Sequence, residues 1–185
     1  MRTVKLQMQV SIDGFCAGPE GQMDWMTWDW DEELKEYVSE LTKPVDTILL
    51  GRKLASGFIP HWAQVAGNSE DPSHSFGKVM HETKKVVFSK TLGDTEWKNT
   101  VLAKDDLTEE VKRLQSKTGG DIIVYGGSLF VSNLIRENLI DKYYLFVNPA
   151  TLGSGLPVFA DRKALKLADV KAFSCGIVLL QYDKA

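Results

Sequence analysis

The first residues of the chain alternate between apolar and polar side chains. The apolar residues Val4, Leu6, Met8, Val10 and Ile12 are each separated by one polar residue. A period of two places successive side chains on opposite faces of an extended chain. We therefore predict a first strand here, with one apolar face and one more polar face.

Three later segments have the spacing of helices. Between residues 31 and 42, apolar side chains recur at helical intervals, with Asp31 as the predicted N-cap and Pro44 just beyond the end. The sequence Asp106-x-x-Glu109 resembles a capping box, and it begins a second helix that is expected to stop at Gly119-Gly120. The third predicted helix covers residues 128–138.

Short apolar runs alternate with these helices and predict buried strands. They occupy residues 47–50, 85–88, 122–125 and 143–147. Strands that alternate with helices favour a parallel sheet that is covered on both faces. The chain ends differently, since residues 170–174 and 177–182 predict a hairpin that turns at Cys175-Gly176.

One segment carries no periodic pattern. Residues 60–77 are rich in Gly, Ser, Asn, Asp and Pro and are predicted to form a long surface loop. The three histidines lie in or beside it and are expected to be exposed or to pack: His61, His74 and His81. The whole pattern predicts one α/β domain over residues 1–185, with a mostly parallel central sheet and an antiparallel C-terminal edge hairpin.

Composition narrows the class of protein. Of 185 residues, 43% are hydrophobic and 25% are charged, as in ordinary globular proteins. The net charge of −3, with dispersed cations, argues against nucleic-acid binding. Cys16 and Cys175 are far apart, so we expect neither a metal site nor a disulfide. No stretch approaches the ~20 apolar residues of a membrane span, and no signal peptide is evident, so a cytoplasmic protein is expected.

Polar residues and glycines follow four of the predicted strands. The four strand ends are Ser11-Ile12-Asp13-Gly14, Gly51-Arg52-Lys53, Ser89-Lys90-Thr91 and Gly126-Gly127-Ser128. In open α/β sheets, ligands bind beyond the carboxyl ends of the strands. Glycines before a helix allow backbone N–H groups to hold a pyrophosphate, and Arg and Lys side chains suit a 2′-phosphate. These ends therefore predict NADPH as the cofactor.

The order of these motifs resembles that of the RibD C-terminal family, the riboflavin-biosynthesis reductases of the dihydrofolate-reductase-like superfamily. The resemblance runs from Val4 to Tyr182, and the segments that carry it are Leu50–Lys53, Val86–Leu92, Trp97, Val124–Ser128, Leu139–Asp141, Asn148-Pro149 and Leu152–Phe159. It implies a three-layer α/β/α sandwich and a homodimer. It also implies a cis bond between Gly126 and Gly127, as in dihydrofolate reductases.

The resemblance further implies which residues contact the cofactor. They are Ser11, Gly51, Arg52, Lys53, Ser89, Lys90, Tyr125, Gly126, Gly127, Ser128 and Leu129. On the substrate side, Asp13 and Asp31 are the candidate catalytic carboxylates. Asp24, Asp29, Glu32 and Glu33 remain open as alternatives, and four tryptophans are candidates to stack on a planar ring or to pack in the core: Trp25, Trp28, Trp30 and Trp62.

The leading functional hypothesis is an NADPH-dependent reductase of a small pyrimidine- or pterin-like substrate, similar to 5-amino-6-(5-phosphoribosylamino)uracil reductase. A second hypothesis is a non-catalytic, dimeric nucleotide-binding protein, because a fold does not fix a function. A third is a true dihydrofolate reductase. The zinc deaminase signatures that often accompany the reductase in riboflavin synthesis are absent from the sequence.

Overall fold

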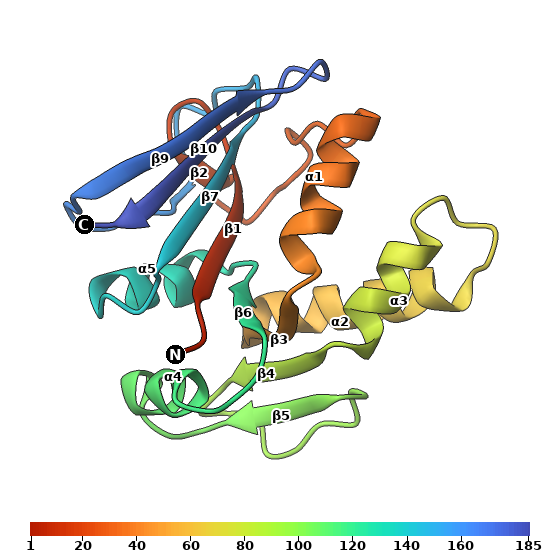
Figure 1. Ribbon diagram of the computed structural model, residues 1–185, viewed down its shortest axis with the longest axis vertical. Helices are drawn as coiled ribbons and strands as arrows, with labels where there is room; N and C mark the ends of the chain where they lie inside the picture. Colours follow the sequence, from red (N-terminus) through yellow and green to blue (C-terminus); the bar gives the residue numbers. More distant parts are fainter.

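The protein, described here by a computed structural model of residues 1–185, is built on an eight-stranded sheet (Figure 1). Its strands are β1 (Val4–Val10), β3 (Val45–Gly51), β4 (Lys84–Phe88), β5 (Thr100–Ala103), β6 (Asp121–Val124), β7 (Lys142–Val147), β9 (Leu165–Ala172) and β10 (Val178–Lys184). They lie in the order β5-β4-β3-β6-β1-β7-β10-β9. The strands from β5 to β7 are parallel, and β10 pairs antiparallel with β7 and β9. The predicted sheet is confirmed.

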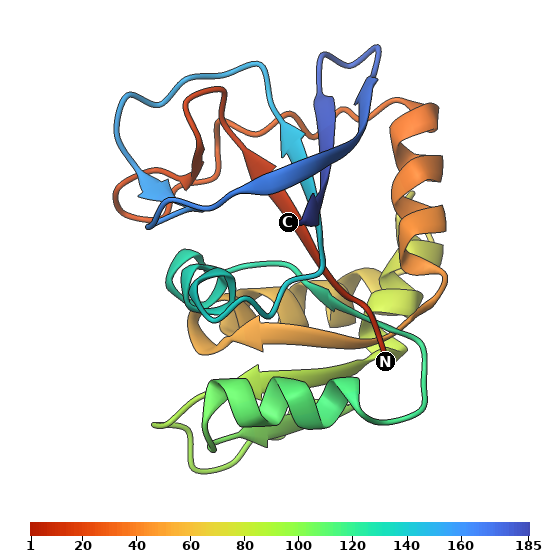
Figure 2. The same ribbon diagram turned by 60° about the vertical axis from the view of Figure 1, so that its left-hand side comes forward.

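Helices cover both faces of this sheet (Figure 2). They are α1 (Glu32–Thr42), α2 (Arg52–Gly67), α3 (His74–Glu82), α4 (Leu107–Gln115) and α5 (Ser128–Arg136). One face packs against α4 and α5 in a single large core. The other face carries one cluster under α1 and a second under α2 and α3. This is the expected three-layer α/β/α sandwich, to which β2 (Phe15–Ala17) and β8 (Leu156–Pro157) add a small separate sheet.

The prediction of a long surface loop at residues 60–77 is wrong. Helix α2 continues through Pro60, and α3 starts soon afterwards, so only residues 68–73 connect the two helices. Proline removes one helical N–H donor, but the turn around it buries Ile59 and packs Trp62 between Phe58 and Phe76. The packing of Ile59 and Trp62 thus outweighs the preference of Pro60 and the polar residues after it for a loop.

Several element ends also differ from the prediction. The histidines expected in or beside that loop lie on α2 and α3. Strand β1 ends at Val10, which leaves Ile12 in a turn and 64% exposed, and α4 ends at Gln115 rather than at Gly119. The C-terminal hairpin is confirmed and is longer than expected. No helix is long and apolar enough to cross a membrane.

A buried lysine on β4 makes folding depend on pH. Lys85 is 1% exposed, and its Nζ donates to the carbonyl of His81 at the end of α3. Burial, helped by Lys98, lowers the pKa of Lys85 from 10.5 to about 8. The folded protein therefore releases this proton at a lower pH than the unfolded chain. The cost of burying the charge is present below pH 8 and disappears as the pH rises.

We expect the free energy of unfolding to rise by about 2 kcal/mol between about pH 8 and pH 10. Above that window it should fall again, because burial raises the pKa of Tyr143 and Tyr144 to about 12. Denaturant titrations at several pH values measure this curve. In Lys85→Met the rise should vanish, whereas Lys84→Met, at the exposed neighbouring position, should keep it. A rise of equal size in Lys85→Met would contradict the assignment.

Candidate functional site

The carboxyl ends of the parallel strands meet at one edge of the sheet, and the predicted site residues gather there. In the order of the sheet they lie at the ends of β4 (Ser89, Lys90), β3 (Gly51, its last residue, with Arg52 and Lys53), β6 (Tyr125, Gly126, Gly127, Ser128, Leu129) and β1 (Ser11, Asp13). These four strands are direct neighbours, and Gly51 pairs with Phe88, the residue before Ser89. Residues separated by more than 100 positions in the sequence thus share one edge.

The order of the strands reverses between β3 and β6. From β3 the chain crosses through α2 and α3 to β4, whereas from β6 it crosses through α5 to β7 on the other side. Helices α2 and α5 also pack on opposite faces of the sheet. Two neighbouring strands therefore send their helices away from each other. Such a switch point is where open α/β sheets bind ligands, and we call this part of the edge, between the ends of β3 and β6, the crevice.

Both helices that leave this crevice have open N-termini. Helix α2 follows Gly51 and α5 follows Gly127, and no side chain caps either helix. Neither helix has an acidic residue in its first turn, whereas Asp31 caps α1 and Asp106 caps α4, each followed by glutamates. Helix α3 also lacks a side-chain cap but follows Ser73. The free N–H groups and the helix dipole make the ends of α2 and α5 suitable for an anion.

Glycines shape the turn before α5. Gly126 and Gly127 both have positive φ angles, 132° and 26°, and the chain contains no cis peptide bond. The cis bond implied by the resemblance is therefore absent, because the two positive φ angles turn the chain while the peptide stays trans. A Cβ at Gly126 would lie 3.3 Å from Met8 Sδ, whereas one at Gly127 would meet nothing within 4 Å. The turn packs on β1 and leaves Gly127 open.

The starts of the two helices approach each other at Gly51. A Cβ there would lie 2.9 Å from the Cβ of Phe130, in the first turn of α5. The absence of a side chain therefore brings the start of α2 and the start of α5 close together. Three exposed cations border this region, namely Arg52, Lys53 and Lys90, and none takes part in an ion pair of the structure. Their charge remains available to an anionic ligand.

The serine side chains at this edge mainly shape turns. Ser11 Oγ donates to Asp13 and accepts from the N–H of Phe15. Ser89 Oγ accepts from the N–H groups of two following residues, which leaves its own O–H as a donor. Ser128 Oγ donates to the carbonyl of Pro157. Of the three, only the Ser89 side chain keeps a donor for a ligand, together with the backbone N–H groups of the α5 turn.

The carboxylate of Asp13 anchors a loop. It accepts hydrogen bonds from Ser11 Oγ at 2.6 Å, and from the N–H groups of Leu152 and Gly153. These bonds, led by the one from Ser11, lower the pKa of Asp13. Asp13 thus lies at the predicted edge, but its carboxylate is ionised and both of its oxygens already accept hydrogen bonds within the protein. We retain Asp13 as a residue that holds the loop at Leu152 and Gly153 against the end of β1.

Asp31 joins two elements at the same edge of the sheet, but beside the end of β7 and not between β3 and β6. One oxygen caps α1 by accepting from the N–H of Leu34 at 2.8 Å, and the other accepts from Ser174 Oγ and from the N–H of Cys175 in the β9–β10 turn. The bond from Ser174 and that from Leu34 lower the pKa of Asp31 to about 2. With both oxygens engaged, Asp31 has a structural role, and we do not retain it as a catalytic candidate.

Removing the Asp31 carboxylate should test this assignment. In Asp31→Ala the helix loses its cap and the hairpin loses its contact, so we expect a lower midpoint of urea unfolding. Nucleotide affinity should stay within a factor of ~2, since nothing at the crevice changes. Equilibrium unfolding and a nucleotide titration on the same preparation give both values. A large loss of affinity with unchanged stability would restore Asp31 to the site.

Asn148 links residues 27–30 to the end of β1, and the sequence indicated it only within a family motif. It is fully buried, its Oδ1 accepts from the N–H of Thr27 at 2.9 Å, and its Nδ2 donates to Gln9 Oε1 at 2.8 Å. Thr27 in turn accepts a hydrogen bond from Trp30 Nε1. Asn148 therefore ties the tryptophan-containing segment to the end of β1, which no local sequence signal indicated.

Exposed apolar side chains also collect near this edge. Leu129 is 77% exposed at the start of α5, Ile12 is 64% exposed after β1, and Trp28 is 62% exposed and stacks on Trp30. Such side chains commonly mark a binding surface. Of the carboxylates left open by the sequence, Glu32 and Glu33 pair with lysines, and Asp24 and Asp29 are exposed in the tryptophan segment.

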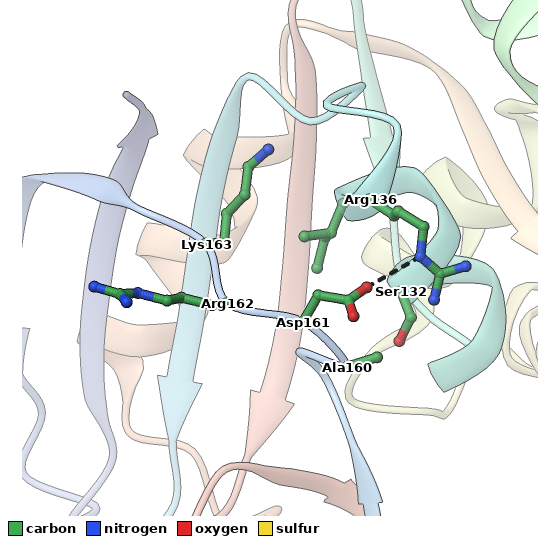
Figure 3. Close-up of a pocket in the computed structure, with 7 residues that line it drawn as sticks. Ser132, Arg136, Ala160, Asp161, Arg162 and Lys163 are labelled. Atoms are coloured by element: carbon green, nitrogen blue, oxygen red, sulfur yellow. Dashed lines mark hydrogen bonds and ion pairs between the residues drawn. The ribbon is translucent and has the colours of Figure 1, made fainter.

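The pocket in Figure 3 lies elsewhere, at the opposite end of α5. Arg136 and Asp161 form an ion pair of 3.0 Å across it, and Arg162 and Lys163 point away from that pair. Arg136 is therefore already neutralised, and the residues that line this pocket include no helix N-terminus.

Known proteins share both the sequence and the fold. The profile of the RibD C-terminal domain matches residues 2–179. The uncharacterized protein YyaP of Bacillus subtilis is 33% identical over 98% of this chain and 94% of its own length. A putative riboflavin biosynthesis protein from a Shewanella species superposes with a TM-score of 0.71 at 19% identity, covering 100% of this chain and 99% of that one. A bifunctional deaminase and 5-amino-6-(5-phosphoribosylamino)uracil reductase from Thermotoga maritima superposes with a TM-score of 0.69 at 19% identity, over 100% of this chain and 57% of its own.

Proposed function

Because the chain belongs to the RibD C-terminal domain family, we propose that it is an NADPH-dependent reductase of a small pyrimidine- or pterin-like compound. The observation that carries this proposal is the crevice between β3 and β6. There, two open helix N-termini lie beside three cations that have no carboxylate partner. A dinucleotide with three phosphate groups matches this charge pattern.

Each part of the crevice suits a part of NADPH. The backbone N–H groups from Gly127 to Leu129 would hold the pyrophosphate, and open space at Gly127 admits it. Arg52 and Lys90, with the Ser89 hydroxyl, would hold the 2′-phosphate beside the ends of β3 and β4. NADPH supplies the hydride, and the protein orients the substrate ring against it.

The substrate class is supported by the relatives. The Thermotoga maritima protein is named for reduction of a phosphoribosylated aminouracil, and the Shewanella protein for riboflavin biosynthesis. In this chain, the exposed Trp28 and the polar end of β1 offer an aromatic face and hydrogen-bonding groups to such a ring.

Loss of NADPH absorbance in the presence of candidate rings tests the proposal. We expect turnover with 5-amino-6-(5-phosphoribosylamino)uracil and little with dihydrofolate. Turnover with dihydrofolate alone would identify a dihydrofolate reductase instead. Tight NADPH binding without turnover on any pyrimidine, pterin or folate would identify a non-catalytic nucleotide-binding protein.

A further inference from the structure

One buried side chain holds a long irregular segment against the sheet. Residues 18–30, between β2 and α1, form no helix or strand, and all but one of their hydrogen bonds connect them to one another. The exception is the N–H of Thr27, which donates to Asn148 Oδ1 at 2.9 Å. Asn148 therefore makes the single hydrogen bond between this segment and the rest of the protein.

Asn148 is itself fixed at the carboxyl-end edge of the sheet. Its side chain is fully buried, and its Nδ2 donates to the carbonyl of Phe146 at 3.1 Å and to Gln9 Oε1 at 2.8 Å. Its backbone N–H donates to the carbonyl of Val10, the last residue of β1. Because both polar atoms of the side chain are engaged, Asn148 keeps one orientation beside β1, the strand next to β6 and the crevice.

Thr27 connects Asn148 to two tryptophans. Its N–H is held by Asn148, and its carbonyl accepts from Trp30 Nε1 at 2.8 Å, so both sides of this residue are fixed. Trp30 packs against the cluster under α1. Its ring stacks on that of Trp28, with 6.2 Å between the centroids and 23° between the planes. The orientation of the Trp28 ring therefore depends on Asn148, through Thr27 and Trp30.

The Trp28 ring is held in place without being buried. It is 62% exposed, and its indole N–H donates to no group of the protein. Ordering an exposed side chain costs conformational entropy, and leaving a large apolar ring in water forgoes the free energy of burying it. Exposed apolar side chains gathered near a site typically belong to a binding surface, and an indole ring stacks well on planar heterocycles.

We propose that Asn148 is a positioning residue of the substrate site, which fixes the Trp28 ring as a stacking surface for the substrate through its hydrogen bond to the Thr27 N–H. Asn148 is buried and touches no ligand, whereas the exposed Trp28 ring makes the contact. This inference rests on the proposed reductase function and adds to it a residue that controls ring binding without controlling nucleotide binding.

The test measures binding of lumazine, a flat pteridine ring that fluoresces, and of NADPH. The variants are Asn148→Ala, Trp28→Ala, the double variant of both, and Asn148→Asp, in which a carboxylate oxygen can still accept from Thr27. Thr47→Val is the matched control, because Thr47 is also buried and hydrogen-bonded but lies near the start of β3. Urea unfolding and the far-UV circular dichroism of the stacked tryptophan pair are recorded for each protein.

Asn148→Ala should bind lumazine about tenfold more weakly than the wild type, and Trp28→Ala should lose about as much. In the double variant, Asn148→Ala should cause no further loss beyond a factor of ~2, because the ring through which it acts is gone. NADPH affinity should stay within a factor of ~2 in all variants.

A merely structural role of Asn148 predicts a different outcome. Asn148→Ala and Thr47→Val should both lower the midpoint of urea unfolding, since each loses a buried hydrogen bond, but only Asn148→Ala should weaken lumazine binding. The exciton band of the stacked tryptophans should decrease in Asn148→Ala and return in Asn148→Asp, together with most of the affinity for lumazine.

Three results would overturn the inference: no binding of lumazine to the wild type, wild-type affinity in Asn148→Ala, or losses that add fully in the double variant. The proposed function fails separately. If lumazine behaves as expected and NADPH does not bind, the role of Asn148 stands and the reductase function is wrong. If NADPH is oxidised with a pyrimidine substrate while Asn148→Ala binds lumazine normally, only the role of Asn148 is wrong.

Discussion

In an Arg52→Ala, Lys90→Ala double variant, the dissociation constant for NADPH should rise by about two orders of magnitude, whereas that for NADH should rise by less than about threefold. Arg52 begins α2 after β3, and Lys90 follows β4, the neighbouring strand. Both side chains are exposed and free of carboxylate partners. Hydrogen bonds to a charged group are each worth about 1.5–3 kcal/mol, so losing two of them produces this effect.

The control removes the same charge elsewhere. Arg162→Ala with Lys112→Ala also deletes two exposed cations that make no ion pair, and it should leave both dissociation constants unchanged. Isothermal titration of each protein with both nucleotides gives the comparison. If the crevice variant lost NADH and NADPH equally, Arg52 and Lys90 would not recognise the 2′-phosphate.

Replacing Gly126 by alanine should weaken binding of both nucleotides by about tenfold or more. At a φ of 132° an L-residue is strained, and the new Cβ would lie 3.3 Å from Met8 Sδ and 3.5 Å from Leu54. A left-handed backbone costs an alanine roughly 1–2 kcal/mol, which the turn can avoid only by moving. Such a movement displaces the N–H groups at the start of α5.

Gly57→Ala is the matched control for that substitution. Gly57 lies inside α2, where a Cβ would meet nothing within 4 Å, so alanine should stabilise the protein by about 0.5–1 kcal/mol and leave nucleotide affinity unchanged. Thermal unfolding and nucleotide titration of the two variants separate the effects. Wild-type affinity in Gly126→Ala would show that the turn before α5 does not hold the phosphates.

The sheet was predictable because its strands carry strong local patterns. The alternation in β1 and the apolar runs of β3, β4 and β6 bury one or both faces, and the glycines after them mark the strand ends. The ends could be assigned to one edge because alternating strands and helices favour parallel pairing. Local patterns failed to predict the helix around Pro60. That helix is stabilised by the packing of Trp62 and Ile59 on residues distant in the sequence.

Roles of single polar residues were harder to predict. Asp31 and Asp13 looked alike as carboxylates near turns, yet each is saturated by partners about 140 positions away in sequence. Hydrogen-bond partners set by the tertiary fold leave no trace in a local sequence pattern.

Isothermal titration of the unmodified protein with NADPH and NADH tests the central claim most directly. We predict one NADPH site per chain, with NADPH bound at least about tenfold more tightly than NADH because of the three unpaired cations at the crevice. NADPH should also quench tryptophan fluorescence and raise the unfolding temperature more than NADH does. Absence of binding by either nucleotide at millimolar concentration would contradict the account.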